Sequence, residues 1–157
     1  MTERVCGACG LCCKLPYVPA LDKPIDTWCS HARPGQGGCA IYPDRPAGCR
    51  TFICSWLAGK LGEEWFPARC KMIVTPSGVL APSGTLTKPG MLIMVDPAYP
   101  NAWRREPYHS QLRAWAGKLL VVIRIGLRCI KLNADGSESE IVGTRAWVEG
   151  RAEEPAK

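Results

Sequence analysis

Cysteine is the residue type in this chain whose number and spacing could do chemistry. Ten of the 157 residues are cysteines, and eight of them lie within the first 54 residues. The eight are Cys6, Cys9, Cys12, Cys13, Cys29, Cys39, Cys49 and Cys54. Thiolate sulfur is a ligand of zinc and of iron–sulfur clusters, so the sequence predicts that these eight side chains bind metal.

The spacing of the thiols favours one kind of centre over another. Cys6-x2-Cys9-x2-Cys12 matches the first three ligands of the bacterial ferredoxin run, whose remaining ligand comes from elsewhere. A zinc ribbon uses two separated Cys-x2-Cys pairs, whereas the later pair here is Cys49-x4-Cys54. We therefore expect a [4Fe-4S]-type cluster, with one or two Zn²⁺ as the alternative.

The adjacent pair Cys12 and Cys13 bears on the number of centres. Neighbouring side chains in extended backbone point to opposite sides, so the two sulfurs need not serve one metal in the same way. One of them could face a second centre. Spacing alone does not divide the eight thiols between centres.

Four other residues could be mistaken for ligands or catalytic groups. Cys70 and Cys129 each stand alone in an expected strand, and free cysteine often behaves as a small core residue. His31 follows Cys29 by two positions, but a position on the surface or behind the ligands suits it better, so it stays outside the ligand set. His109 has no acidic or nucleophilic partner nearby in sequence, and we expect it at the surface or in packing.

Cations and tryptophans accompany the cysteines. Arg45 and Arg50 flank Cys49, and a cation near a thiolate stabilises the charged, ligand-competent form. Trp28 and Trp56 stand close to cysteines in the sequence, where they could shield a metal from water. Packing alone explains the tryptophans equally well.

Composition and motifs limit the classes of function. Residues 1–20 hold no apolar run of secretory-signal length, and the most apolar segment, Leu119–Ile125, is interrupted by Arg124. We therefore expect a cytoplasmic, reduced protein without membrane contact. The net charge is +6, but the basic residues are spread and thiolates would lower it, so a nucleic-acid partner is not expected.

No catalytic residue is predicted, because the sequence holds no GxGxxG, P-loop, HExxH or nucleophile elbow. The chain is accordingly expected to bind metal, with a role in redox or metal handling and with any protein partner left open. The alternatives are a zinc-stapled structural or interaction module and a metal-dependent enzyme component.

The composition of the chain changes near residue 55. Residues 1–54 hold six prolines and six glycines and show no sustained helical or strand period. Such a segment cannot build a core unaided, so a bound metal is expected to offset its chain entropy. We assign residues 1–57 to a cysteine-cluster metal-binding region, residues 58–150 to an α+β body of the same domain, and residues 151–157 to a frayed tail.

The body shows the patterns of short strands and of one or two helices. Helical segments are expected at 55–65, ending before Pro67, and at about Asn101–Lys118. Strands are expected at Cys70–Thr75, Val79–Leu80, Met91–Asp96, within 119–132 and at Glu140–Trp147, with a turn at Asn133–Gly136. The predicted fold class is α+β, with a Cys-rich, loop-rich, metal-organised N-terminal region packed on a small antiparallel sheet.

The first third of the chain resembles the YkgJ-type cysteine-cluster family, proteins with a CxxCxxCC signature described as zinc- or iron-chelating. The matching pieces are CGACGLCC at 6–13, KPIDTWCSH at 23–31 and GGCAIYPDRPAGCRTFICSWL from 38 onward. The resemblance covers about residues 6–57 and implies that the eight matching cysteines form a thiolate metal site. Some relatives carry a further cysteine where this chain has Ala32. A related signature is similar to that of a flagellin lysine methylase thought to hold an iron–sulfur cluster, which favours iron.

Overall fold

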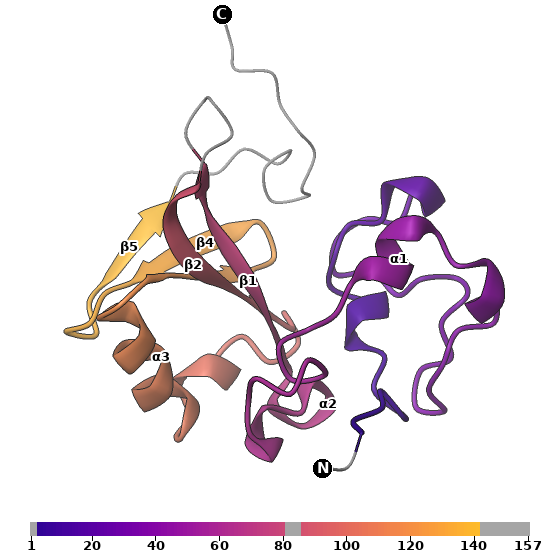
Figure 1. Cartoon of the computed structure of the whole chain (residues 1–157), viewed down its shortest axis with the longest axis horizontal. Helices are drawn as coiled ribbons and strands as arrows, with labels where there is room; N and C mark the ends of the chain where they lie inside the picture. The colour runs from indigo at the N-terminus through magenta and orange to yellow at the C-terminus, as the bar shows by residue number, and fades with distance from the viewer. Residues whose placement is uncertain (1–2, 81–85, 142–157) are drawn as a thin grey trace, which may run out of the picture.

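Five strands form one sheet in the part of the chain that follows residue 70. In the computed structural model, which describes residues 3–80 and 86–141, they are β1 (Met72–Leu80), β2 (Leu86–Val95), β3 (Leu120–Ile125), β4 (Arg128–Leu132) and β5 (Glu138–Ile141). The strands lie in the order β1-β2-β3-β4-β5. The architecture is α+β, as the sequence predicts (Figure 1).

The sheet is mixed rather than antiparallel. β2 pairs with β3 in parallel, whereas the other three pairs are antiparallel. A parallel pair needs a crossover of a dozen or more residues, and residues 96–119 supply it. This crossover contains η5 (Ala102–Arg104) and α3 (Tyr108–Ala116), and α3 covers one face of the sheet (Figure 1). The expectation of a wholly antiparallel sheet is therefore wrong at β2 and β3.

The helices are shorter than the sequence predicts. Segment 55–65 forms turns and then η4 (Glu63–Trp65), because Gly59 adopts a φ of +75° that a helix does not accommodate. Pro107, which has no N–H to donate, separates α3 from η5 within the expected helix. Cys70 ends α2 (Pro67–Cys70) instead of beginning a strand. Throughout the described residues, every helix is too short or too polar to cross a membrane.

The C-terminal strands follow the sequence pattern closely. Residues 119–132 form two strands, joined at Gly126, whose φ is +61°. The turn at Asn133–Gly136 is confirmed, since the Gly136 N–H donates to the Asn133 carbonyl at 2.9 Å. The expected strand to Trp147 is described only as far as Ile141, and the expected tail at 151–157 lies outside the described residues.

The first face of the sheet carries the main core. Side chains of neighbouring strand residues alternate between the two faces, so Met72 and Val74 of β1 share this face. They pack with Leu112 of α3 and with Trp65 and Trp103, all of which are buried.

Residues 3–54, here called the N-terminal lobe, lie beside the sheet (Figure 1) and contact its second face. Ile73 and Met94 of the sheet pack there against Leu11 and Leu15 of the lobe. In residues 3–54, Leu11 and Leu15 are the hydrophobic side chains that are buried. The helical turns of the lobe are η1 (Leu11–Cys13), η2 (Pro19–Leu21), η3 (Tyr42–Asp44) and α1 (Ala47–Thr51), none longer than five residues.

A buried ion pair joins the lobe to the sheet. Arg124 of β3 is only 2% exposed, and its Nη1 lies 3.2 Å from Asp26 Oδ2. Its Nη2 donates to the Leu15 carbonyl at 2.9 Å. Lys14 adds a second pair, with its Nζ 2.9 Å from Oδ1 of Asp96, just after β2. Lys14 directly follows Cys13, and Leu15, which accepts from Arg124, lies two residues beyond Cys13.

Replacing Arg124 tests how strongly this contact holds the lobe. Arg124→Met leaves Asp26 without its cation, and removing one partner of a buried pair costs about 3–5 kcal/mol. The matched control is Arg128→Met, which removes the exposed pair with Glu140 at a cost of about 0–1 kcal/mol. Denaturant unfolding of both variants measures the two free energies. Equal losses would show that Arg124 does not anchor the lobe.

Candidate metal centre

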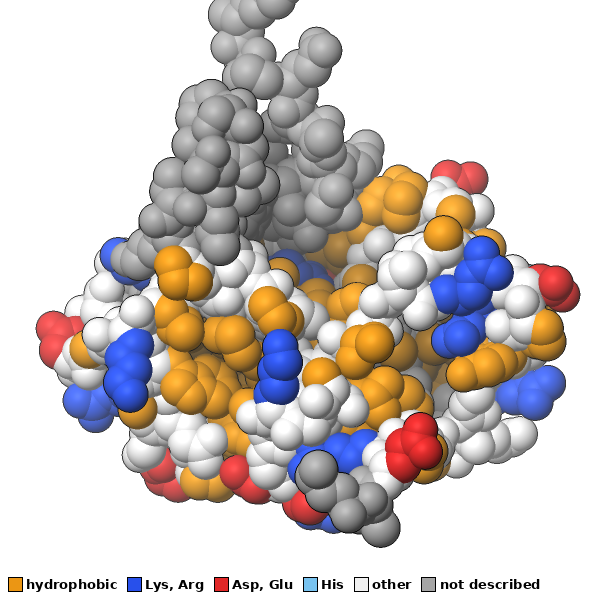
Figure 2. Space-filling view, in the orientation of Figure 1, with side chains coloured by type: hydrophobic (Ala, Val, Ile, Leu, Met, Phe, Trp, Pro, Cys, Tyr) orange, Lys and Arg blue, Asp and Glu red, His pale blue; other side chains and the backbone are white. Residues whose placement is uncertain are grey.

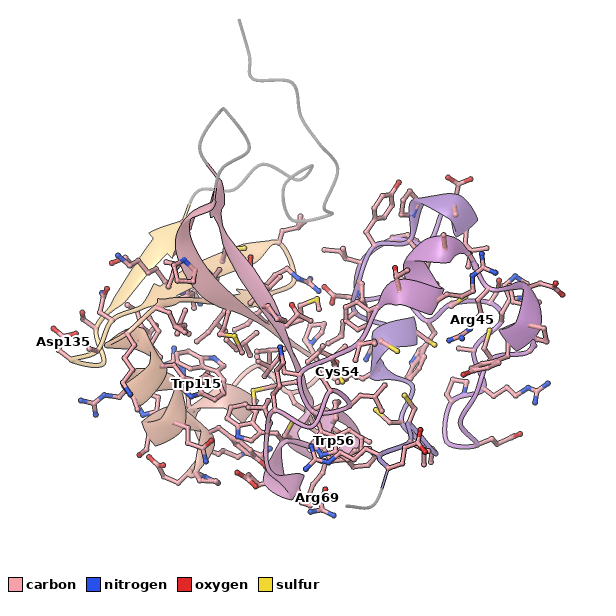
Figure 3. All side chains as sticks on the ribbon, in the orientation of Figure 1. Arg45, Cys54, Trp56, Arg69, Trp115 and Asp135 are labelled. Atoms are coloured by element: carbon pink, nitrogen blue, oxygen red, sulfur yellow. The ribbon has the colours of Figure 1, made fainter. Side chains whose placement is uncertain are left out.

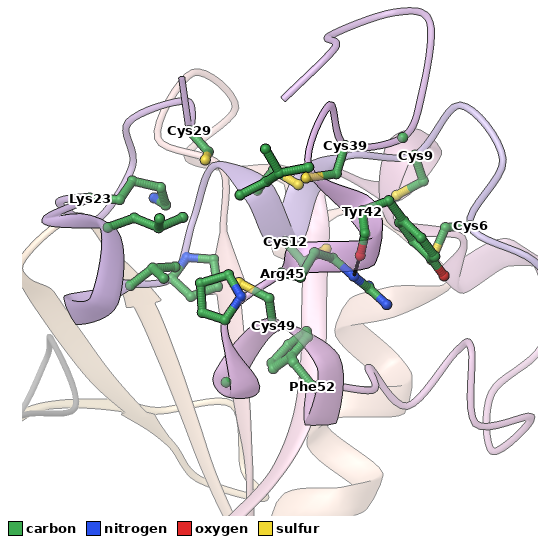
Figure 4. A pocket seen from close by; sticks show the side chains of 18 of the residues that line it. Cys6, Cys9, Cys12, Lys23, Cys29, Cys39, Tyr42, Arg45, Cys49 and Phe52 are labelled. Carbon is green, nitrogen blue, oxygen red and sulfur yellow. Dashed lines mark hydrogen bonds between the residues drawn. The ribbon is translucent and has the colours of Figure 1, made fainter. Parts of the chain in front are cut away.

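The N-terminal lobe contains a cavity of about 430 Å³, here called the larger cavity (Figure 4). Seven of the eight cysteines predicted as ligands line it. They are Cys6, Cys9, Cys12, Cys13, Cys29, Cys39 and Cys49. Thiols separated by more than forty residues in sequence thus come together at one place in the fold.

Cys54 lines a second, smaller cavity of about 30 Å³. Cys6, Cys9 and Cys12 line this smaller cavity too, so they lie between the two spaces. Figure 3 places Cys54 where the lobe meets the sheet, away from Arg45 within the lobe. Hydrophobic side chains, a class that here includes cysteine, gather along the middle of the face shown in Figure 2, between the lobe and the sheet.

Tight turns position the first four cysteines. The Cys9 N–H donates to the Cys6 carbonyl at 2.8 Å, closing a turn in which Gly7 has a φ of +53°. The chain then enters η1, where the Cys13 N–H donates to the Gly10 carbonyl at 2.8 Å. Leu11 is buried against the sheet and anchors this segment, while the sulfurs of its cysteines face the cavities.

Backbone hydrogen bonds bring the later cysteines to the first segment. The Cys29 N–H donates to the Cys13 carbonyl at 2.9 Å. The loop then returns, with an isolated antiparallel bridge between Ala32 and Cys39. Cys49 lies in α1, and its N–H donates to the carbonyl of Pro46 at 3.0 Å. Pro46 directly precedes α1, and its fixed φ suits the sharp turn of the backbone into the helix.

The loop before Cys39 lies directly against the Cys6–Cys9 turn. A Cβ at Gly37 would stand 2.1 Å from the carbonyl oxygen of Gly7 and 2.8 Å from Cα of Ala8. Only glycine permits this approach, and Gly37 also has a φ of +78°. The close contact sets how near the Cys39 loop comes to Cys6.

Lys23 is the buried cation of the lobe, and the sequence analysis did not identify it. Its Nζ donates to the carbonyls of Lys14, Pro24 and Thr27 at 2.7, 2.7 and 2.8 Å, which satisfies all three N–H groups. Burial lowers the pKa of Lys23, while the nearby thiol of Cys29 raises it. The side chain lines the larger cavity. Its one signal in the sequence is its place in the KPIDTWCSH segment.

Arg45 supplies a second positive charge at the larger cavity. Its Nε donates to the Tyr42 carbonyl at 3.0 Å, and its guanidinium lies 3.7 Å from the centre of the Tyr42 ring. Arg45 lines the cavity, which agrees with the expectation that a cation of the Arg45–Arg50 segment lies near the thiols. Arg50 does not line it and is exposed, so only one of the two predicted arginines is placed near the thiols.

Burial opposes ionisation of several of the thiols. It raises the pKa of Cys6 and Cys49, against a lowering by Arg45. It also raises the pKa of Cys9, although the backbone N–H groups of Leu11 and Ala68 lower it. Free thiolates are therefore disfavoured at these three positions. Binding of a metal, which replaces the thiol proton, would offset this cost.

The thiols of Cys12 and Cys13 are hydrogen-bonded to each other. The hydrogen bond from the Cys12 thiol lowers the pKa of Cys13 to about 7, and the same bond raises the pKa of Cys12. Lys23 and Arg45 lower the pKa of Cys13 further. In the reduced protein, Cys13 is therefore the thiol of this pair that ionises near neutral pH.

The thiols surround a space wider than one ion requires. In a tetrahedral zinc site with Zn–S bonds of about 2.3 Å, neighbouring sulfurs lie about 3.8 Å apart. Across residues 3–80 and 86–141, no three Cys, His, Asp or Glu side chains are grouped closely enough to hold a single ion. The donor set consists of thiols alone, which suits zinc or an iron–sulfur cluster, and the larger cavity has room for a polyatomic group.

The remaining predictions concern residues away from the cavities. Cys70 and Cys129 are confirmed as core residues, at 0% and 1% exposure, and burial raises the pKa of Cys70 to about 11. His109 packs 5.9 Å from the Trp103 ring, also as expected. His31 is partly buried and lines neither cavity.

The two tryptophans that stand near cysteines in the sequence differ in position. Trp28 is 41% exposed and lines neither cavity, whereas Trp56 is buried and lines the smaller one. The indole N–H of Trp56 has no hydrogen-bond partner among the described residues. Of the two, only Trp56 is placed to shield a bound group.

Comparison with known proteins adds nothing to this geometry: no protein-family model, curated protein or solved structure matches the chain.

The contact at Gly37 is tested by a pair of glycine substitutions. Gly35 and Gly37 have φ values of +76° and +78°, but a Cβ at Gly35 meets nothing within 4 Å. Gly35→Ala should cost about 1–2 kcal/mol of backbone strain, and Gly37→Ala should cost about 1–3 kcal/mol more because the loops must separate. Denaturant unfolding distinguishes them. Equal costs would mean that the Gly7 contact is not tight in solution.

Alkylation of the reduced, metal-free protein tests the Cys12–Cys13 pair. The rate of Cys13 modification by iodoacetamide should rise with pH through a midpoint at about pH 7, because the thiolate is the nucleophile. Cys12→Ala removes the donor and should move the midpoint upward, toward the ordinary value of about 8.5. Peptide mass spectrometry follows each site, with buried Cys70 as the unreactive reference. An unchanged midpoint in Cys12→Ala would contradict the hydrogen bond between the two thiols.

Proposed function

We propose that this chain is a thiolate-ligated metal-binding protein whose cysteines carry an iron–sulfur cluster of the [4Fe-4S] type. The observation that carries the proposal is the convergence of eight cysteines, spread over 49 residues of sequence, on two adjoining cavities. The resemblance to the YkgJ-type cysteine-cluster family points in the same direction. A reducing compartment such as the cytoplasm fits an unpaired state of all ten cysteines.

The packing of the lobe supports a bound group. Residues 3–54 bury two leucines and otherwise hold together through turns, isolated bridges and the ion pairs of Lys14 and Asp26. Small loop-rich units with so little apolar burial usually depend on a metal or on disulfides, and none of the cysteines is in a disulfide. A metal that binds the folded lobe and not the unfolded one would stabilise it directly.

Iron–sulfur chemistry is favoured over zinc by the separation of the thiols. A cluster places several iron and sulfide atoms between its ligands, so its thiolates stand further apart than those around one zinc ion. The spacing Cys6-x2-Cys9-x2-Cys12 with a distant fourth thiol is also typical of cluster ligation. A single Zn²⁺ would require the described side chains to draw together from their present positions.

The surrounding residues fit a negatively charged group. Lys23 and Arg45 place two cations at the larger cavity, and Lys23 cannot turn away because three carbonyls hold its ammonium. Phe52, which lines both cavities, limits the access of water. A cluster in such a setting supplies one-electron redox chemistry. Electron transfer and the holding of iron are the roles that this arrangement supports.

Metal analysis of protein purified without oxygen tests the proposal. We expect a brown protein whose broad visible absorbance bleaches on reduction, with iron and acid-labile sulfide in about equal amounts. The control is Cys129→Ala, which removes a buried thiol of β4 and should leave the metal content unchanged. A colourless protein with stoichiometric zinc would replace the cluster by a zinc-stapled module. A protein that takes up neither iron and sulfide nor zinc would overturn metal binding altogether.

A further inference from the structure

The two cavities divide the eight cysteines in a way that the sequence does not show. One group lines the larger cavity only, and consists of Cys13, Cys29, Cys39 and Cys49. Cys54 lines the smaller cavity only. Cys6, Cys9 and Cys12 line both. Since a closed zinc or cubane centre takes four protein thiolates, the three shared thiols and Cys54 make one complete set, and the other four make a second.

We propose that the chain holds two separate four-thiolate centres. The junction centre is formed by Cys6, Cys9, Cys12 and Cys54, and the loop centre by Cys13, Cys29, Cys39 and Cys49. This inference rests on the proposed function, because it divides the same thiols between two centres.

Contacts with the sheet define the junction centre. Cys9, Cys12 and Cys54 all pack against the small core that Ile73 forms with the leucines of the lobe. Cys54 is fixed there because the next residue, Ser55, donates its N–H to the Val74 carbonyl of β1 at 2.8 Å. The Cys49-x4-Cys54 pair is thereby pulled apart, with Cys54 at the sheet and Cys49 in the lobe.

A hydrogen-bond donor without a partner lies at the smaller cavity. Trp56 is 7% exposed and lines the smaller cavity, and its indole N–H has no partner in the described part of the chain. A buried donor without an acceptor costs about 1–3 kcal/mol. Sulfur bound in this cavity would offer the missing acceptor, so the position of the Trp56 N–H fits a ligand beside Cys54.

Contacts within the lobe define the loop centre. The backbone bond from Cys29 to Cys13 and the bridge that ends at Cys39 join three of its four segments. Figure 4 shows Cys29 beside Lys23 at one end of the cavity and Cys6 and Cys9 at the other.

The two centres meet at Cys12 and Cys13. Both residues lie in η1, a 3-10 turn with three residues per turn, so their side chains leave the backbone about 120° apart. Each can therefore serve a different centre, although the two residues are adjacent in the chain. The two centres are consequently neighbours, and an electron on one is near the other.

Single substitutions test the division. Anaerobically purified wild-type protein should hold about eight iron and eight sulfide atoms, four for each cubane. Cys54→Ser and Cys49→Ser should each halve both contents, their combination should remove nearly all metal, and Cys129→Ala should change nothing. Two zinc ions that are lost one at a time in the same variants would support the division and replace the cluster.

The outcomes separate this inference from the proposed function. A wild-type protein with one centre, or single variants that each lose all metal, would overturn the division while metal binding stands. A wild-type protein without metal would overturn both. If the variants do not fold, electron paramagnetic resonance of the reduced wild-type protein decides: two spins per chain with mutual coupling support two neighbouring clusters, and one uncoupled spin overturns them.

Trp56→Phe provides a readout specific to the junction centre. Losing a hydrogen bond to sulfur makes a cluster harder to reduce, so one of the two reduction potentials should fall while the other stays. Trp103→Phe is the matched control, because the Trp103 N–H is also unpartnered but lies in the main core. Equal shifts of both potentials, or none, would count against a junction centre beside Trp56.

Discussion

The constraint on which this structure depends is the cost of ordering fifty residues that have almost no core of their own. The N-terminal lobe buries Leu11 and Leu15 and little else that is apolar. Backbone turns and isolated bridges define its path, but hydrogen bonds that replace bonds to water contribute only modestly to stability. Thiolate–metal bonds are the strong interaction available to such a segment, and they would act on the same loops that the turns bring together.

The N-terminal lobe packs on the second face of the sheet. The first face of the sheet is covered by the tryptophan-rich core, which leaves Ile73 and Met94 on the second face to receive the lobe. Arg124 crosses the same boundary with its charge satisfied by Asp26 and by backbone carbonyls. β1 and β2 supply the apolar contact and β3 supplies the ion pair, so the parallel pairing of β2 with β3 places both contacts beside the lobe.

Charge and burial act on the thiols in opposite directions. Desolvation raises the pKa of Cys6, Cys9 and Cys49, which penalises free thiolates in a lobe without metal. The cations Lys23 and Arg45 offset part of this penalty at the larger cavity. Metal binding would therefore release protons and weaken as pH falls, since the ligands must be deprotonated.

The sequence by itself determined the features that depend on neighbouring residues. The α+β class, the turn at Asn133–Gly136 and the core positions of Cys70 and Cys129 follow from local pattern and composition, because each reflects a few adjacent residues. The clustering of Cys6, Cys9 and Cys12 was predictable for the same reason. Their three-residue intervals allow one turning segment to gather the sulfurs.

Only the tertiary structure decided which cavity each of the eight thiols lines. Cys49 and Cys54 are close in sequence, yet the bond from Ser55 to β1 carries Cys54 to the sheet and leaves Cys49 in the lobe. The parallel pairing of β2 with β3 and the burial of Lys23 likewise arise from contacts between distant segments. Such contacts leave no periodic pattern in the chain, because the partners that create them are separated by tens of residues.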